Sequence, residues 1–243
     1  MKNVLVTGAT SEVGQAICKR LASNNNIIIH YHTKKEEAFR LKEELEKKYN
    51  NKCICIEADL TKEKDINNLM DIAFNEMKTI DILINNAALD KPNIFDLKEK
   101  EDFCEILDVN LIAPFLLSKR IGKEMSNNKF GKIINIASTN GIDTYYPMCL
   151  DYDASKAGLI SLTHNLALQF KPYVNVNAIA PGWIKTEKDI SDLSEDYIKE
   201  EEEKIFKNRF GEVDEIAYLV EFLVSDKADY INNQVIRIDG GMY

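Results

Sequence analysis

Short, almost continuous runs of apolar residues alternate along the chain with longer charged segments whose apolar residues recur at helical spacing. Seven runs are candidate strands, namely Val4–Val6, Ile27–Ile29, Cys53–Ile56, Ile80–Ile84, Ile133–Ile136, Val174–Ile179 and Val235–Ile238. Between them the pattern predicts helices around 13–23, 34–49, 63–78, 99–125, 152–171 and 212–224. Strands without polar alternation are typical of a sheet covered on both faces. The pattern therefore predicts an α/β fold with a doubly wound, parallel, seven-stranded sheet and helices on both faces.

No linker rich in Pro, Gly or Ser interrupts this pattern, so residues 1–243 are expected to form one domain. The less regular stretch 185–211 is its candidate mobile part. The Asn runs 24–26 and 50–51 are expected in turns, because Asn tolerates left-handed backbone. The acidic run Glu200–Glu203 is expected to be a solvated helix face.

Charge and cysteine usage exclude several classes of protein. A formal net charge of −9 argues against nucleic acid or an anionic membrane as the main partner. No apolar run approaches the ~20 residues that cross a bilayer, and Val4–Val6 is too short for the core of a signal peptide. The five cysteines and three histidines show no metal-ligand spacing. We expect a protein of the reducing cytoplasm without a metal site.

A candidate phosphate-binding loop follows the first strand, in the segment Thr7–Gly14. Gly8 at the strand end permits a tight turn. Gly14, opening the next helix, lets backbone N–H groups and the positive helix end approach a pyrophosphate. Two glycines at this spacing also occur in ordinary turns, so the position beyond a strand's carboxyl end carries more weight than the pattern.

The end of the second strand bears on the choice of dinucleotide. An acidic residue there selects NAD by accepting hydrogen bonds from the ribose 2′-hydroxyl, and residues 27–35 contain none. His32 and Thr33, followed by Lys34 and Lys35, offer donors to a 2′-phosphate. NADP(H) is therefore favoured over NAD(H), although the same residues also fit a solvated loop.

The chemistry is concentrated at Tyr152 and Lys156, which lie four residues apart and so share one helix face. An ammonium stabilises a phenolate and lowers the pKa of the phenol toward the working range. Ser138, fourteen residues before Tyr152, follows a strand and can stabilise a developing alkoxide. A Tyr–Lys pair by itself also fits two unrelated surface residues. The order of the motifs along the chain is what supports a catalytic role.

That order resembles the short-chain dehydrogenase/reductase family along essentially the whole chain. The loop resembles the family's TGxxxGxG, with Glu12 in place of the middle glycine. We expect the Glu12 carboxylate, which would repel a pyrophosphate, to turn toward solvent. The resemblance implies a single Rossmann-fold domain and a catalytic set of Asn110, Ser138, Tyr152 and Lys156, with Asn110 holding a water in a proton relay toward the lysine.

Further motifs match the family's cofactor site. They include Asp59 after the third strand, the segment Asn85–Ala88 resembling NNAG, the segment Pro181–Thr186, and Asp239–Gly241 near the C-terminus. Together with the residues above, the predicted cofactor contacts are Gly8, Thr10, Ser11, Val13, Gly14, His32, Thr33, Asp59, Leu60, Asn86, Ala87, Ala88, Tyr152, Lys156, Pro181, Gly182, Ile184 and Thr186.

Within the family, the segments 208–217 and 234–241 look most like those of 3-oxoacyl-[acyl-carrier-protein] reductases, and they also fit many sugar, polyol and steroid dehydrogenases. The resemblance implies NADPH-dependent reduction of a 3-oxoacyl thioester in fatty acid biosynthesis. Another carbonyl or alcohol substrate is the alternative, and a non-catalytic cofactor sensor is a minor one. The segment 187–206 is the expected substrate lid.

The same resemblance implies two kinds of partner. An acyl carrier protein would meet basic residues beside the active site, for which Lys129 with Lys119, Arg120 and Lys123 is the candidate patch. The net charge of −9 would oppose an acidic carrier unless this patch prevails. The helices at 99–125 and 152–171 would pair between subunits in a homotetramer.

Overall fold

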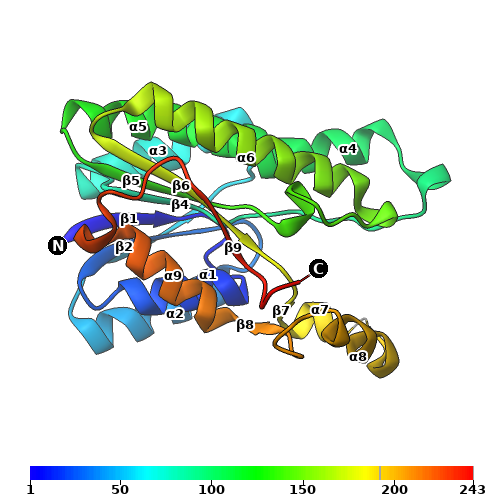
Figure 1. The fold of residues 1–243 in the computed structure, drawn as a ribbon. Helices are drawn as coiled ribbons and strands as arrows, with labels where there is room; N and C mark the ends of the chain where they lie inside the picture. The colour runs from blue at the N-terminus through cyan, green and yellow to red at the C-terminus, as the bar shows by residue number, and fades with distance from the viewer. Residues whose placement is uncertain (192, 243) are drawn as a thin grey trace.

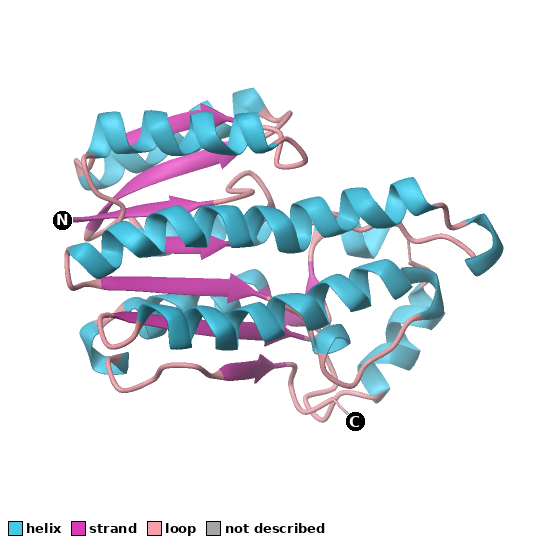
Figure 2. Cartoon of the chain, turned by 90° about the horizontal axis from the view of Figure 1, so that it is seen from above, coloured by secondary structure: helices cyan, strands magenta, loops and turns pink. Residues whose placement is uncertain are grey.

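All seven predicted strands form, and they pair in one parallel sheet in the order β3-β2-β1-β4-β5-β6-β9. The computed structural model describes residues 1–191 and 193–242. The strands are β1 Lys2–Val6, β2 Asn25–Tyr31, β3 Cys53–Glu57, β4 Ile82–Asn85, β5 Gly131–Ile136, β6 Val174–Pro181 and β9 Val235–Ile238. Figure 2 shows their arrows running in one direction. The predicted parallel sheet is confirmed.

Helices cover both faces of the sheet (Figure 1). One layer contains α1 Glu12–Leu21, α2 Lys35–Tyr49 and α9 Val213–Val224, and the other contains α3 Glu63–Met77, α5 Ala113–Asn127 and α6 Leu150–Phe170. A hydrophobic core lies between the sheet and each helix layer. Val4 and Val6 of β1 pack in the core beneath α1, α2 and α9, whereas Leu5 packs in the core beneath α3, α5 and α6. Both faces of the strand are thus buried, which explains its unbroken apolar sequence. The doubly wound α/β fold is confirmed.

The predicted helix at 99–125 is interrupted. It consists of α4 Lys100–Leu107, a π-helical turn η2 Asp108–Ile112, and α5. A π turn accommodates one extra residue in a helix and often marks a functional site. Short 3₁₀ turns lie at η1 Phe95–Leu97, η3 Thr139–Gly141, η4 Pro147–Cys149 and η5 Asp226–Ala228.

The two Asn runs behave differently. Asn50 ends α2 with φ of 51°, in the left-handed conformation expected of it. Asn25 and Asn26 are instead the first residues of β2, so their prediction as a turn was wrong. The Asn26 side chain donates to Asn3 Oδ1 at 2.9 Å, and this neighbour on β1 satisfies its polar group within the sheet.

The stretch 185–211 is more regular than expected. It contains α7 Glu187–Ser191 and α8 Glu195–Glu203, flanked by a two-stranded sheet of β7 Ile184–Lys185 and β8 Gly211–Glu212. Asp192, within the predicted lid, and Tyr243, within the predicted domain, lie outside the described residues. These elements lie beyond the carboxyl ends of the strands (Figure 1).

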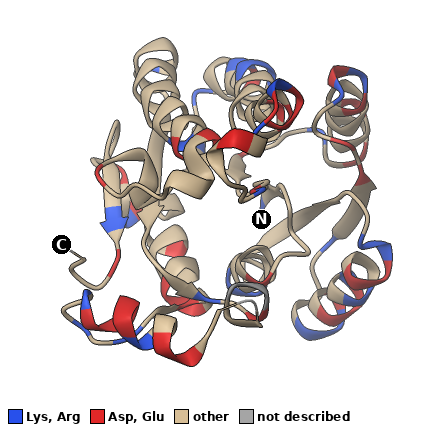
Figure 3. Ribbon diagram, turned by 90° about the vertical axis from the view of Figure 1, so that its right-hand side faces the viewer, with Lys and Arg blue, Asp and Glu red and all other residues tan. Residues whose placement is uncertain are grey.

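The carboxyl edge of the sheet is where ligands bind in such folds, at the point where the strand order reverses. Here that point lies between β1 and β4. Charged residues of both signs are spread over the helices that surround this edge (Figure 3). Among the described residues, no helix is long and apolar enough to span a membrane.

Candidate active site

The loop between β1 and α1 is fixed by glycine geometry and by Asn86. Gly8 has φ of +60°, and a Cβ there would lie 2.8 Å from Ala87 Cα. The Asn86 amide donates to the carbonyls of Thr7 and Gly8 at 2.9 and 3.1 Å. Ser11 caps α1 by accepting from Gly14 N–H at 3.0 Å. The helix end faces the carboxyl edge, and this arrangement fits a pyrophosphate.

His30 also supports this loop, although sequence reasoning gave it no role. Its Nδ1 accepts from Gly8 N–H at 3.0 Å, so the proton lies on Nε2, which is 3.1 Å from the carbonyl of Ala58. Burial lowers the pKa of His30 to about 4. A neutral imidazole therefore joins the phosphate loop to the end of β3. The signal available in the sequence was a His at the end of an apolar strand.

Glu12 is half-exposed, and its carboxylate also contacts the lid. Its Oε1 accepts a hydrogen bond from the backbone N–H of Glu187 at 2.8 Å, at the start of α7. The first N–H groups of a helix have no partner within the helix, and a carboxylate satisfies one of them. Glu12, Thr186, Glu187 and Val213 are among the residues that line an open pocket of about 530 Å³.

Residues predicted at the adenosine end lie after β2 and β3. His32 and Thr33 are exposed beyond β2. Leu60 is buried, and Asp59 accepts from Thr61 N–H at 3.0 Å and pairs with Lys62 at 2.8 Å. Although burial opposes it, bonding by Lys62 and Thr61 lowers the pKa of Asp59 to about 2. Asp59 is therefore an anion that shapes the turn after β3.

Lys156 is fully enclosed on α6, with 2% of its surface exposed. Its Nζ donates to the carbonyl of Ile136 at 2.8 Å and lies 5.3 Å from the centre of the Tyr152 ring. Burial lowers the pKa of Lys156 to about 8, against the opposing effect of Asp90. A lysine with a pKa this close to neutrality is suited to proton chemistry.

Ser138 follows β5 and lies on the same side as the start of α6. Its hydroxyl donates to Asn140 Oδ1 at 3.1 Å, and the Asn140 amide donates to Asp153 at 2.7 Å. Asp153 also accepts from Tyr146 N–H at 3.2 Å. Through Asn140 and Asp153, Ser138 is thus connected to the helix that carries Tyr152 and Lys156.

Asn110 lies in the π-helical turn and is completely buried. Its Oδ1 accepts from Leu89 N–H at 2.7 Å, and its Nδ2 donates to Leu89 C=O at 2.9 Å and to Ser155 Oγ at 3.0 Å. Asn110 therefore joins the segment after β4 to the helix that carries Tyr152 and Lys156.

The remaining predicted cofactor residues surround the same edge. Pro181 ends β6, and Gly182 packs so closely against Asp239, the residue after β9, that a Cβ would lie 2.8 Å from Asp239 Cβ. Ile184 is buried in β7, and Thr186 directly precedes α7. The predicted contacts near the phosphate loop differ in burial. Thr10 is buried, Val13 and Ala87 are half-buried, and Ala88 is exposed.

The lid contacts the site through a cluster that sequence reasoning missed. Glu201 of α8 is 3% exposed, so the prediction of a solvated face is wrong for this residue. Its Oε2 accepts from Tyr146 OH and from Trp183 Nε1, each at 3.0 Å, and Oε1 pairs with Lys204 at 2.6 Å. The Trp183 ring stacks on Phe210 with centroids 5.3 Å apart. Partners distant in sequence thus bury one member of an acidic run.

Lys129 does not lie beside the active site of its own chain. It is exposed and precedes β5, whereas Ser138 follows that strand. A strand of this length separates its ends by about 20 Å. The expected basic patch is therefore centred at the opposite edge of the sheet. Arg120 of that patch is already paired with Asp71 at 2.5 Å.

The described residues contain no group of three or more His, Cys, Asp or Glu side chains arranged to hold a metal ion.

Comparison with known proteins agrees with this geometry. A sequence model of the family described as short chain dehydrogenase matches residues 2–196. The chain is 38% identical to 3-oxoacyl-[acyl-carrier-protein] reductase FabG of Aquifex aeolicus, over 98% of this chain and 96% of that protein. It is 32% identical to glucose 1-dehydrogenase 2 of Bacillus subtilis, over 99% and 94%.

A solved structure supports the same assignment. The gluconate 5-dehydrogenase of Burkholderia cenocepacia, in complex with NADP and tartrate, superposes with a TM-score of 0.90 at 26% identity, covering 98% of this chain and 94% of that one. The chain therefore belongs to the short-chain dehydrogenase family, and it is an oxidoreductase of C=O or CH–OH groups that binds a nicotinamide cofactor.

Proposed function

We propose that the protein is an NADPH-dependent reductase that converts a 3-oxoacyl thioester to the 3-hydroxyacyl form. The observation that carries the catalytic part is the enclosed Lys156 ammonium, 5.3 Å from the centre of the Tyr152 ring. The thioester part is supported by the full-length similarity to 3-oxoacyl-[acyl-carrier-protein] reductases.

The side chains divide the work as follows. The bound cofactor supplies the hydride that reaches the carbonyl carbon. Tyr152 donates the proton to the carbonyl oxygen, and the neighbouring Lys156 charge stabilises the phenolate that remains. Ser138 now donates to Asn140, and a substrate oxygen replaces that acceptor so that the hydroxyl stabilises the developing alkoxide. Asn110 keeps α6 in register with the segment after β4.

NADP(H) is the proposed cofactor in preference to NAD(H). The phosphate loop with its capped α1 fits the pyrophosphate. His32, Thr33, Lys34 and Lys35 are exposed at the end of β2, where they can meet a 2′-phosphate. The remaining predicted contacts, from Asp59 and Leu60 to Thr186, surround the same edge of the sheet.

We further propose a cytoplasmic homotetramer. The five cysteines of the chain are all free thiols, which is consistent with a reducing compartment. Ile112 at the end of η2, Phe115 on α5 and Leu168 on α6 are large apolar side chains exposed at 42, 39 and 61%. Such side chains on neighbouring helices support association between copies of the chain. The segment 185–211 would act as the substrate lid.

A second candidate is a dehydrogenase for another carbonyl or alcohol, such as a sugar or polyol. The position of Lys129, at the edge opposite Ser138, favours it, because a carrier bound there would not face this chain's own active site. The similarity to glucose 1-dehydrogenase 2 and to gluconate 5-dehydrogenase points the same way.

The deciding experiment follows NADPH oxidation with a short 3-oxoacyl thioester, on the acyl carrier protein and on coenzyme A, beside sugar and polyol substrates. Turnover that prefers the carrier form supports the proposal. Cofactor binding without turnover of either thioester would reject the thioester proposal and favour the second candidate.

A further inference from the structure

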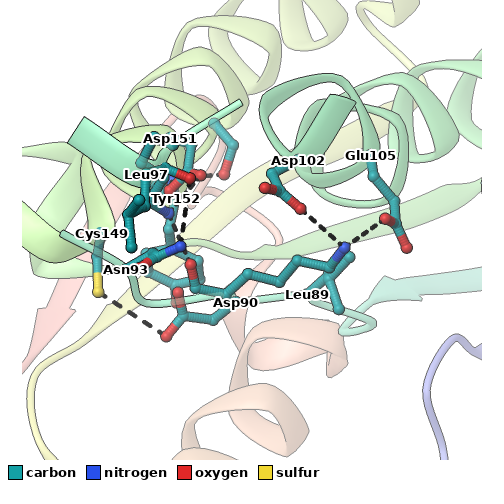
Figure 4. Close-up of polar contacts among 12 residues, drawn as sticks. Leu89, Asp90, Asn93, Leu97, Asp102, Glu105, Cys149, Asp151 and Tyr152 are labelled. Carbon is teal, nitrogen blue, oxygen red and sulfur yellow. Dashed lines mark hydrogen bonds and ion pairs between the residues drawn. The ribbon is translucent and has the colours of Figure 1, made fainter. Parts of the chain in front are cut away.

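Tyr152 lies between two acidic residues in the first turn of α6, and each of them binds a different segment of the chain. The first, Asp151, is completely buried and accepts from Lys98 Nζ at 2.6 Å. It also accepts from Tyr152 N–H at 3.0 Å. In Figure 4, Asp151 and Tyr152 lie beside the segment that follows β4, to which Asp90 belongs. This side of the turn is therefore attached to the segment between β4 and α4.

The second acidic residue, Asp153, binds the segment that carries Ser138, and it does so at two points. Its Oδ1 accepts from the Asn140 side-chain amide at 2.7 Å, and its Oδ2 accepts from Tyr146 N–H at 3.2 Å. Asn140 lies in η3, and Tyr146 directly precedes η4. Both oxygens of a carboxylate accept hydrogen bonds, so one side chain can hold both donors. Asp153 therefore attaches both ends of the loop between η3 and η4 to α6.

Asn140 extends this attachment to the Ser138 hydroxyl. Its Nδ2 faces a carboxylate, which only accepts, so its Oδ1 is left to accept from the Ser138 hydroxyl at 3.1 Å. The backbone N–H of Asn140 donates to Ser138 Oγ at 3.2 Å. One residue thus binds the Ser138 hydroxyl both as donor and as acceptor, and Asp153 determines which way its side-chain amide is turned.

The turn η3 also packs directly on the backbone of α6. A Cβ at Gly141, the last residue of η3, would lie 2.6 Å from the carbonyl carbon of Lys156. Only a glycine lets the turn approach the helix this closely. The turn is therefore packed on α6 at Lys156 and hydrogen-bonded to it at Asp153. Contacts at two places on one helix leave Ser138 little freedom to move relative to Tyr152.

We infer that Asp153 is a positioning residue, whose carboxylate fixes the Ser138 hydroxyl relative to the Tyr152 phenol through Asn140. The inference rests on the proposed roles of Ser138 and Tyr152, and it holds for any carbonyl substrate.

The physical reason is that both groups have to reach one substrate oxygen. Tyr152 supplies a proton to that oxygen, and Ser138 stabilises its developing charge with a hydrogen bond. When the substrate oxygen replaces Asn140 Oδ1 as the acceptor, the backbone N–H of Asn140 still holds Ser138 Oγ. A displacement of about 1 Å can lower the rate of such a reaction by about 10²-fold.

The test is a double-mutant cycle of Asp153→Ala and Ser138→Ala, measured as kcat of NADPH oxidation with acetoacetyl-coenzyme A. Asp153→Ala should lower kcat about tenfold. KM should change little, because the Ser138 hydrogen bond is strongest to the charged oxygen of the transition state. In the Ser138→Ala protein, Asp153→Ala should have almost no further effect, since Asp153 acts through Ser138. Asn140→Ala breaks the same connection from the other side and should reproduce both results.

A second measurement uses the ligand-free protein. Hydrogen exchange of residues 138–146, followed by mass spectrometry, reports the attachment itself, because Tyr146 N–H loses its acceptor in Asp153→Ala. Exchange in this segment should be several-fold faster in that variant. Asp214→Ala is the matched control, since Asp214 is an exposed acidic residue in the first turn of α9. It should change neither kcat nor the exchange rate, and a thermal melt shows whether each variant is folded.

A loss of kcat in Asp153→Ala that disappears in the Ser138→Ala protein supports the inference. The same fractional loss in both proteins overturns it, because Asp153 then stabilises the fold without acting through Ser138. Unchanged kcat or unchanged exchange in Asp153→Ala overturns it as well.

Failure of the proposed function looks different. Full activity in Ser138→Ala would reject the proposed role of Ser138, and the inference with it. If the unaltered protein does not reduce the thioester, the thioester proposal alone is rejected, and the cycle is measured with the carbonyl substrate that the protein does reduce.

Discussion

The carboxylate of Glu12 and the backbone N–H of Glu187, 175 residues apart in the chain, meet at 2.8 Å. The first turn of the helix at the phosphate loop is thereby joined to the first turn of the lid. The Glu12 carboxylate lies in the first turn of α1, where a negative charge is favourable, and it also accepts from the first N–H of α7. In the proposed enzyme this contact would lie beside the cofactor's pyrophosphate.

Glu12→Gln should increase the affinity for NADPH. The variant keeps an oxygen acceptor for Glu187 N–H and removes a negative charge near the phosphate loop, which is worth on the order of 1 kcal/mol at a partly exposed site. The gain should therefore be a few-fold, measured by fluorescence titration, and it should shrink as salt is added. Weaker NADPH binding by the variant would show that the Glu12 charge is not repulsive.

Tyr152→Phe should abolish turnover while leaving cofactor binding nearly intact. Loss of a positioned proton donor lowers the rate by about 10² to 10⁴-fold, measured as kcat of NADPH oxidation. Tyr230→Phe, at a fully exposed position, is the matched control and should behave as the unaltered protein. If cofactor binding disappears together with activity, Tyr152 has been assigned the wrong role.

His30 should make the fold sensitive to mild acid. Its pKa is lowered by burial to about 4, so between pH 6.5 and pH 4 the unfolded chain binds a proton that the folded chain does not. The stabilisation is complete above pH 6.5 and is lost as the pH falls toward 4, by up to about 3 kcal/mol.

Urea unfolding at pH 7 and pH 4.5 measures this loss. The comparison is between the unaltered protein and His30→Asn, in which the group that titrates is absent. A smaller loss of unfolding free energy in the variant is expected. Because the comparison concerns the change with pH, a uniformly less stable variant does not affect it, and equal losses would contradict the assignment.

Glu201→Gln should loosen the lid. The glutamine brings an amide donor toward groups that donate to the carboxylate, from Tyr146, Trp183 and Lys204. A buried donor without an acceptor costs about 1–3 kcal/mol, so hydrogen exchange in α8 should accelerate. Trp183 is the chain's single tryptophan, and its emission should shift to longer wavelength. Glu200→Gln, at an exposed neighbour, should change neither observable.

Much of the fold could be predicted because each strand repeats the same physical signal. Val4, Leu5 and Val6 are apolar without interruption since both faces of β1 are covered. The Tyr152–Lys156 pair was predictable for a similar reason, because a spacing of four residues on a helix fixes a shared face.

The missed features depend on contacts between distant parts of the chain. Glu201 looks like its acidic neighbours until Tyr146 and Trp183 are placed against it. Asn25 and Asn26 look like turn residues, and only the pairing of β2 with β1 makes a strand favourable for them. His30 acquires its role from Gly8 and Ala58, which it joins, and local periodicity carries no such information.

The π-helical turn at Asn110 makes this part of the chain intolerant of changes in length. Each residue of an α-helix turns the chain by about 100°. Deleting one residue from η2 would give an unbroken helix, but Asn110 would rotate relative to the apolar side of α5, where Leu117 and Ile121 are buried. Either the bonds of Asn110 to Leu89 and Ser155 or the packing of α5 would then be lost. The single extra residue of the π turn therefore sets how Asn110 is rotated about the helix axis relative to the buried side of α5.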